Sequence, residues 1–195
     1  MLQMRAALVL FKGTGSIDVA LEKAGWHVTS LDILPKFNAT FTENILTWDY
    51  KQFEPGHFEF IWASPVCTEF SILLNRRPRN LELGDVLALK ALEIINYFKP
   101  SHWCLENPQT GLLKTREYML GLPFIDVCYC KWGFPYKKAT RLWCNFAFDG
   151  RPMCTKNCRC DTFGDGKHTK SVVGHSTLRK YRVPPKLCTA IVEAL

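Results

Sequence analysis

Two side chains that can do chemistry follow short apolar runs in this sequence. Cys67 lies in residues 64–71 (SPVCTEFS), directly after the apolar run 58–63, and Glu106 directly follows the run 102–105. A deprotonated thiol is a nucleophile, and a carboxyl group beside it can donate or accept a proton. A cysteine after a buried strand is commonly a packing residue, and a glutamate there is commonly solvated, so the pair needs support from other residues.

A glycine-containing turn follows the first apolar run. Residues 11–15 read FKGTG and precede a helical pattern over 16–24. Glycines let a backbone approach a ligand closely, and a helix N-terminus favours negative charge. Asp32, at the end of the second apolar run, can accept hydrogen bonds from both hydroxyls of a ribose. These features favour a nucleoside-containing ligand, and the alternative is an ordinary turn with an exposed aspartate.

The elements that must position these residues alternate between strand and helix patterns over the first 145 residues. Strands are expected at 5–11, 26–33, 58–63, 102–105, 124–129 and 141–146, and helices at 16–24, at 85–98 with Asp85 as its cap, and at 186–195. The alternation predicts an α/β fold with a mostly parallel sheet flanked by helices. Ligands bind beyond the carboxyl ends of such strands, where Asp32, Cys67 and Glu106 fall.

The composition excludes several classes of protein. The chain has 195 residues, of which 47% are apolar, 22% charged and 13% aromatic, so a disordered chain is excluded and one globular domain is expected. No apolar run approaches the roughly 20 residues that span a bilayer. The N-terminal residues show no signal-peptide cleavage pattern. We therefore expect a soluble intracellular protein with no membrane partner.

The excess of basic residues is concentrated near the C-terminus. Residues 151–195 carry nine Lys/Arg and three Asp/Glu, a net +6 of the +7 of the whole chain. Arg76, Arg77 and Arg79 add a local basic run, where a mobile segment could grip phosphates. A basic patch suits a phosphate-bearing partner such as a nucleic acid. It also suits a solvated surface, and charge alone leaves both interpretations open.

The nine cysteines are interpreted as thiols, because the chain has no secretory features. Residues 147–182 form a small, basic, Cys-rich insert that is too short for a domain of its own. Its Cys154, Cys158, Cys160 and His168 can hold a tetrahedral structural zinc. The alternative is a flexible basic loop with free thiols. Five further cysteines are interpreted as packing residues: Cys104, Cys128, Cys130, Cys144 and Cys188.

Five motifs in order over residues 8–195 resemble those of the cytosine-C5 DNA methyltransferase family. The family has Phe-x-Gly-x-Gly in its cofactor loop, Pro-Cys followed by Phe-Ser in its nucleophile loop, and Glu-Asn in its acid motif. Residues 132–138 (WGFPYKK) resemble its Tyr-Gly-x-Pro-Gln-x-Arg stretch, and residues 183–194 resemble its closing helix. The resemblance implies a single domain over 1–195 with the Rossmann-like fold of S-adenosylmethionine-dependent methyltransferases.

The resemblance also implies roles for individual residues. The cofactor S-adenosylmethionine would be bound by Phe11, Gly13, Gly15, Asp32 (ribose), Ile33 (adenine), Asp49 (adenine amino group) and Pro65 (methionine end). Cys67 would be the nucleophile, Glu106 the acid at the base edge, and Lys138 a helper near the base or the thiolate. A loop beside basic residues is expected to lower the pKa of the nucleophilic thiol.

The implied reaction is methyl transfer to carbon 5 of cytosine in DNA through a covalent Cys67 adduct, with the base flipped out of a duplex. The sequence departs from the family at Val66, Glu69, Thr140 and residues 179–182. Two alternatives stay open, the same reaction on RNA and a catalytically decayed nucleic-acid-binding accessory protein. Because the insert 147–182 replaces a target-recognition domain, we expect sequence selectivity to be short or absent, to be supplied by a protein partner, or to be directed at a substrate other than long duplex DNA. Such a compact member suits the cytoplasm or nucleoid of a prokaryotic or virus-infected cell.

Overall fold

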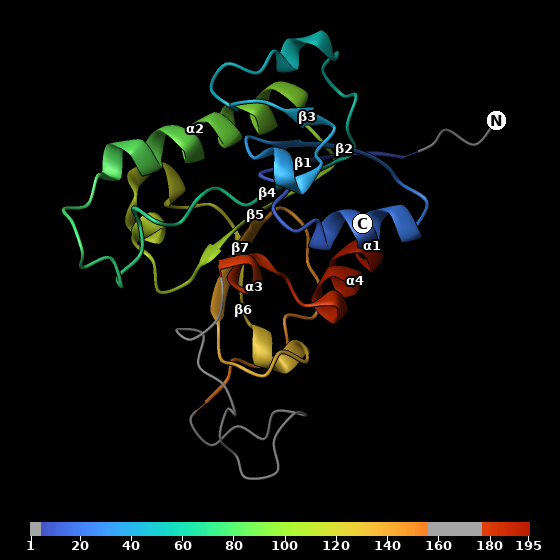
Figure 1. Ribbon diagram of the computed structural model, residues 1–195. Coiled ribbons are helices and arrows are strands. Elements are labelled where there is room, and N and C mark those ends of the chain that lie inside the picture. Colours follow the sequence, from blue (N-terminus) through green and yellow to red (C-terminus); the bar gives the residue numbers. More distant parts are fainter. Residues whose placement is uncertain (1–4, 156–176) are drawn as a thin grey trace.

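The computed structural model describes residues 5–155 and 177–195 (Figure 1). Within these residues one sheet has seven strands: β1 (Ala6–Leu10), β2 (His27–Asp32), β3 (Phe41–Thr42), β4 (Phe60–Ala63), β5 (His102–Pro108), β6 (Phe124–Cys128) and β7 (Ala139–Cys144). Their order across the sheet is β3-β2-β1-β4-β5-β7-β6. The pairs from β3 to β5 are parallel, and β7 runs antiparallel to both of its neighbours. The predicted mostly parallel α/β sheet is confirmed.

Helices cover both faces of the sheet, as Figure 1 shows. Side chains of a strand alternate between the two faces. Ala7 and Val9 of β1 therefore pack with α1 (Ser16–Lys23) and α4 (Pro185–Glu193), whereas Leu8 and Leu10 pack with α2 (Leu81–Phe98). All four side chains are fully buried. The two resulting cores hold the sheet rigid, so that its carboxyl edge can carry loops in fixed positions.

Short elements fill several connections. They are the 3₁₀ helices η1 (Pro35–Phe37), η2 (Tyr50–Gln52), η3 (Leu112–Thr115), η4 (Glu117–Met119) and η5 (Tyr129–Trp132), and the helix α3 (Thr177–Tyr181). These elements and β3 were not predicted, because two to five residues are too few to show a periodic pattern. In the described part of the chain, no helix is long and apolar enough to cross a membrane.

The start of α2 differs from the prediction. The helix begins at Leu81, one turn earlier than expected, because the Asn80 side chain caps it by accepting a hydrogen bond from the Leu83 N–H at 3.0 Å. Asp85 lies inside the helix and does not cap it. Its carboxylate accepts hydrogen bonds from Arg116 Nε at 2.9 Å and from Tyr118 Oη at 2.6 Å. Asp85 therefore ties α2 to the segment after β5.

The predicted insert 147–182 is only partly described, since residues 156–176 lie outside the described residues. Its first part continues from β7, and its last part includes α3, next to the glycine turn in space. The organisation as one domain with a small insert remains a prediction.

Candidate active site

The predicted site residues meet at one edge of the sheet. Asp32 is the last residue of β2, Glu106 lies near the end of β5, and Cys67 follows the end of β4. Since β2, β4 and β5 are connected through parallel pairs, their carboxyl ends share this edge. The sheet therefore brings these three side chains to the same side of the molecule.

The glycine turn (residues 11–15) is joined to the end of β2 by a hydrogen bond to the Asp32 side chain. Gly13 and Gly15 have positive φ angles of 54° and 68°, a conformation that favours glycine. The Gly13 N–H donates to Asp32 Oδ2 at 2.9 Å, and the Leu34 N–H donates to Asp32 Oδ1 at 2.9 Å. Each carboxylate oxygen has a further acceptor site, so Asp32 can still accept hydrogen bonds from a ligand hydroxyl.

The residues beyond β2 and β3 form the outer part of this half of the site. Ile33 is 59% exposed although it is apolar, which leaves its side chain available to pack against a flat ligand group. The Glu43 N–H donates to the Asp32 carbonyl at 3.2 Å, so Glu43 and Asn44 lie beside the end of β2. Asp49 is exposed and precedes η2. Its place near an adenine remains a prediction.

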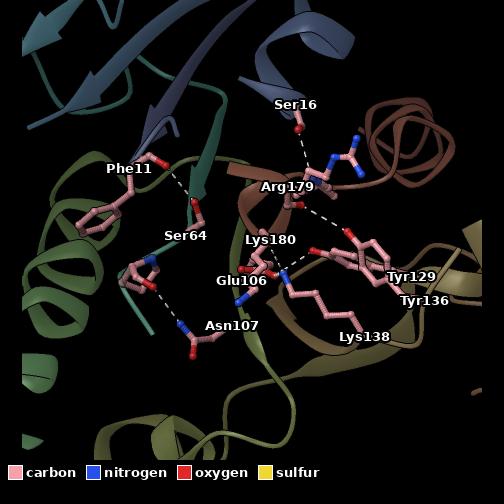
Figure 2. A network of polar contacts seen from close by, with 12 residues as sticks. Phe11, Ser16, Ser64, Glu106, Asn107, Tyr129, Tyr136, Lys138, Arg179 and Lys180 are labelled. Atoms are coloured by element: carbon pink, nitrogen blue, oxygen red, sulfur yellow. Dashed lines mark hydrogen bonds and ion pairs between the residues drawn. The ribbon is translucent and has the colours of Figure 1, made fainter. Parts of the chain in front are cut away.

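The nucleophile loop is tied to the loops on both sides of it (Figure 2). Ser64 Oγ donates to the carbonyl of Phe11 at 3.0 Å, which joins this loop to the glycine turn. Asn107 Nδ2 donates to the carbonyl of Pro65 at 2.9 Å, which joins it to the end of β5. Phe11 and Pro65 thus contribute main-chain acceptors. The three loops are fixed relative to one another before any ligand binds.

Glu69, a departure from the family pattern, organises the residues after Cys67. Its buried carboxylate accepts hydrogen bonds from the Arg77 guanidinium and from the Asn80 N–H, the latter at 2.8 Å. Hydrogen bonding to Arg77 lowers the pKa of Glu69 to about 2. Arg79 Nη2 donates to the Ser71 carbonyl at 2.7 Å. Two of the three arginines predicted to grip phosphates are therefore used within the loop itself.

Glu106 has two partners on the segment between the antiparallel strands β6 and β7. Tyr129 Oη donates to Glu106 Oε1 at 2.9 Å, and Lys138 Nζ lies 3.5 Å from the same oxygen (Figure 2). Glu106 Oε2 takes part in neither contact. Sequence reasoning missed Tyr129, because a tyrosine within an apolar run cannot be distinguished from a packing residue without its partner. Lys138 was predicted near the base or the thiolate, and the structure places its ammonium beside the Glu106 carboxylate. Its role as a helper stays a prediction.

Residues 178–183, which we call the closing segment, are attached to the site through their backbone. Lys138 Nζ donates to the carbonyl of Lys180 at 3.1 Å, and Tyr136 Oη donates to the carbonyl of Arg179 at 3.3 Å (Figure 2). The Val183 N–H donates to Ser16 Oγ at 3.2 Å. None of these contacts needs a particular side chain at residues 179, 180 or 183. The segment can therefore dock here although residues 179–182 differ from the family pattern.

The pKa of the Cys67 thiol differs from the expectation. Burial raises the pKa of Cys67, the negative charge of Glu106 raises it further, and the ammonium of Lys138 lowers it by less. The lowering of the pKa that was expected from basic neighbours is therefore smaller than the rise caused by burial and Glu106. The pKa of Tyr181 is raised by burial and then by the negative charges of Cys67 and Asp32, so this phenol lies within reach of both halves of the site.

A cavity of about 630 Å³ opens beside the glycine turn. Its lining comes from the turn, from η1 and from the closing segment: Gly13, Thr14, Lys36, Phe37, Leu178, Arg179 and Arg182. Lys36, Arg179 and Arg182 are exposed and carry positive charge. The cavity therefore combines main-chain atoms of the turn with three cations, an environment that suits an anionic group.

The predicted metal ligands are only partly described. Cys158, Cys160 and His168 lie outside the described residues, so this ligand set remains a prediction. Cys154 is described and buried. Its sulfur lies close to those of Cys128 and Cys130, which the sequence analysis had assigned to packing.

Comparison with known proteins gives a similarity over nearly the full length of the chain. No protein-family model matches the chain. The chain is 31% identical to a protein of frog virus 3 (isolate Goorha) named "Probable DNA (cytosine-5)-methyltransferase", over 95% of this chain and 98% of that protein. It is also similar to a crystal structure of an E. coli prophage protein that is described as a "putative DNA modification methyltransferase", with a TM-score of 0.54 and 16% identity. That similarity covers 72% of this chain but about half (46%) of the prophage protein, and it shows a shared methyltransferase fold.

Proposed function

Because the chain belongs to the DNA (cytosine-5)-methyltransferase family, we propose that it transfers a methyl group from S-adenosylmethionine to carbon 5 of cytosine in DNA, through a covalent adduct on Cys67. The observation that carries this proposal is the meeting of Cys67, Glu106 and Lys138 beside the glycine turn. A thiol, an acid and a cation at one sheet edge are the groups that this reaction needs from the protein.

Cys67 and Glu106 divide the work on the base. Carbon 5 of cytosine is a poor nucleophile within the aromatic ring. When the Cys67 thiolate adds to carbon 6, an S–C bond forms and the electrons of the C5–C6 double bond move toward N3, which takes a proton from Glu106. Carbon 5 then becomes nucleophilic. After methylation, solvent takes the carbon 5 proton, the S–C bond breaks to release the Cys67 thiolate, and the N3 proton returns to Glu106.

The partners of Glu106 suit this role. Tyr129 and Lys138 both engage Oε1, which leaves Oε2 for the edge of the base. Tyr129 is fully buried, so it fixes the orientation of the carboxyl group from the interior. Lys138 also opposes the rise in the pKa of Cys67, and its ammonium can stabilise a thiolate or a negatively charged base.

The other half of the site fits the cofactor. S-adenosylmethionine supplies an electrophilic methyl group on a positively charged sulfonium. We assign Gly13 and Gly15 to the close approach of the backbone, Asp32 to the ribose, and the exposed Ile33 to the adenine. Phe11 and Pro65 hold the turn and the nucleophile loop together through their carbonyls. Asp49 remains a candidate for the adenine amino group, together with Glu43 and Asn44.

The nucleic-acid substrate is proposed to be DNA, as the name of the frog virus relative suggests. The cations of the cavity beside the glycine turn support binding of a phosphate backbone near the site. RNA as the substrate, a protein partner that supplies target specificity, and loss of catalysis remain the alternatives to be tested.

Covalent trapping tests the proposal. The full-length protein is incubated with S-adenosylmethionine and with oligonucleotides that contain 5-fluorocytosine, as duplex DNA, single-stranded DNA and RNA. Fluorine at carbon 5 prevents the final proton loss, so the Cys67 adduct should survive denaturant and be detected by mass spectrometry. We expect the adduct with DNA. An adduct formed with RNA alone would show that RNA, and not DNA, is the substrate.

Variants give the controls. Cys67→Ser should abolish the adduct and retain cofactor binding in equilibrium dialysis. Lys138→Met should slow adduct formation, whereas Lys137→Met, its exposed neighbour, should not. If the wild-type protein binds cofactor yet forms no adduct with any of the three substrates, the catalytic proposal fails and an accessory nucleic-acid-binding role takes its place.

A further inference from the structure

Three cysteines gather at the end of β6, on elements that the proposed reaction does not use directly. Cys128 ends β6, Cys130 lies in η5, and Cys154 comes from the segment after β7. Their Sγ atoms all lie within 4.8 Å of one another, and those of Cys128 and Cys130 are 3.3 Å apart. All three residues are buried.

These side chains are separate from the two main cores. Cys104, Cys144 and Cys188 pack among the large apolar residues of the sheet and helices. Cys128, Cys130 and Cys154 instead form a small cluster of their own, joined by Met153. A cluster composed almost entirely of sulfur-containing side chains contributes little apolar area, so packing alone is a weak reason for three thiols to meet here.

The distances match those expected for thiolates around one metal ion. In a tetrahedral zinc site the Zn–S bonds are about 2.3 Å, which places sulfur atoms about 3.8 Å from one another. The Cys128–Cys130 sulfur distance of 3.3 Å and the upper limit of 4.8 Å on the other sulfur–sulfur distances are compatible with that value. A disulfide would need two sulfur atoms about 2.05 Å apart, and it would join only two of the three cysteines.

Contacts that involve no sulfur bring Cys154 to this place. Gly150 packs so closely against β6 that an added Cβ would lie 2.6 Å from Ile125 Cγ2. The Arg151 guanidinium stacks over the Trp132 ring at 4.1 Å and donates to the carbonyl of Lys131 at 2.6 Å. The segment is therefore docked on β6 and η5 independently of the thiols, which makes the cluster a formed site.

We propose that Cys128, Cys130 and Cys154 bind a structural Zn²⁺ ion as thiolates. Three sulfur ligands select zinc over Mg²⁺ or Ca²⁺, which prefer oxygen. Each thiol releases its proton to solvent as its Zn–S bond forms. The ligand set differs from the one predicted from sequence, because two of its members come from β6 and η5, ahead of the insert.

The site would connect the start of the insert to the catalytic acid. Cys128 and Cys130 flank Tyr129, whose hydroxyl donates to Glu106 at 2.9 Å. A metal that fixes both neighbours of Tyr129 also fixes the orientation of its ring. This consequence rests on the proposed role of Glu106, whereas the metal site itself does not, and metal content is measured independently of methylation.

Metal analysis tests the proposal on the full-length protein, purified under reducing conditions without added metal. We expect about one zinc per chain by mass spectrometry of the elements. Cys128→Ala and Cys154→Ala should lose it, and Cys188→Ala should retain it, since Cys188 is an equally buried cysteine in the main core. Zinc that is lost on substitution of Cys158, Cys160 or His168 but retained by Cys128→Ala would return the site to the set predicted from sequence and overturn the proposal.

Cobalt provides a measurement that does not depend on folded variants. Co²⁺ added to the chelator-treated wild-type protein should give the intense visible bands of tetrahedral cobalt and the near-ultraviolet thiolate charge-transfer band. Zn²⁺ should then bleach both. A wild-type protein that carries no zinc and gives no cobalt bands would show that the three thiols are packing residues, and the proposal would be wrong.

Discussion

The two halves of the proposed active site, one for the cofactor and one for catalysis, are held in different ways. On the cofactor side, the Asp32 carboxylate accepts hydrogen bonds from two main-chain N–H groups, so its position depends on the backbone alone. On the catalytic side, Cys67, Glu106 and Lys138 act on one another through their charges. The cofactor half is therefore preformed, whereas the protonation state of the catalytic half depends on what else enters the site.

The largest effect is expected from Glu106→Gln, which affects the catalytic half alone. The amide keeps the shape of the side chain but cannot protonate N3 of the base. We expect single-turnover methylation to slow by about 10²–10³-fold, the usual cost of removing one such group. The dissociation constant of S-adenosylmethionine, measured by calorimetry, should stay within twofold. A rate within fivefold of the wild type would remove Glu106 from the chemistry.

Asp32→Asn affects the other half, with a smaller effect. An asparagine is neutral and has one acceptor oxygen, so the Gly13 and Leu34 N–H groups both lose a charged partner and one of them loses its acceptor altogether. Such hydrogen bonds contribute about 1.5–3 kcal/mol, which corresponds to roughly 10–100-fold weaker cofactor binding. The rate at saturating cofactor should change little. An equal loss in rate and no loss in affinity would contradict the division of the site into two halves.

The same binding assay tests which residue binds the adenine end of the cofactor. Asp49→Asn should weaken cofactor binding if Asp49 has the role that the resemblance implies. An unchanged affinity in Asp49→Asn, together with a weaker one in Asn44→Ala, would move this role to the end of β3.

The sequence predicted the parts of the fold and site that are encoded locally. The apolar runs located the main strands, and the rule for parallel sheets placed Asp32, Cys67 and Glu106 at one edge. Contacts between distant segments could not be predicted in this way. Asn80 and Asp85 are both good helix caps in isolation, and it is Arg116 and Tyr118, about 30 residues away, that engage Asp85. The role of Tyr129 could not be predicted for the same reason, because periodicity does not reveal the partner of a buried hydroxyl.

Gly84→Ala tests how the nucleophile loop is anchored. Inside an exposed helix this change would stabilise the protein by up to about 1 kcal/mol. Here the new Cβ would lie 2.8 Å from Phe70 Cζ and 3.2 Å from Glu69 Cβ. We therefore expect destabilisation by about 1–3 kcal/mol in urea unfolding, and slower methylation because the loop that carries Cys67 shifts. Val86→Ala, on the exposed side of α2, should change stability by less than about 0.5 kcal/mol. A stabilised Gly84→Ala would show that the loop has room to move.

The smallest effect is expected in the pH dependence of Cys67 alkylation by iodoacetamide without ligands. Only the thiolate reacts, and burial together with Glu106 raises the pKa of Cys67 above the ordinary value of 9.0. The rate should therefore rise with pH through a midpoint above 9.0. Glu106→Gln removes a negative charge and should lower this midpoint, and Lys138→Met removes the opposing cation and should raise it. Lys137→Met provides the control and should leave it unchanged.

The cofactor should act on the same midpoint, and this links the two halves. Its sulfonium brings a positive charge into a site where Lys138 alone does not offset burial and Glu106. Positive charge favours a thiolate, so saturating S-adenosylmethionine should lower the alkylation midpoint of Cys67 in the wild-type protein. In Asp32→Asn the same shift should require a higher cofactor concentration, because the preformed half then binds more weakly. If the midpoint does not move when cofactor is bound, the cofactor half does not control the protonation of the catalytic half, and the thiol must be activated by the nucleic acid instead.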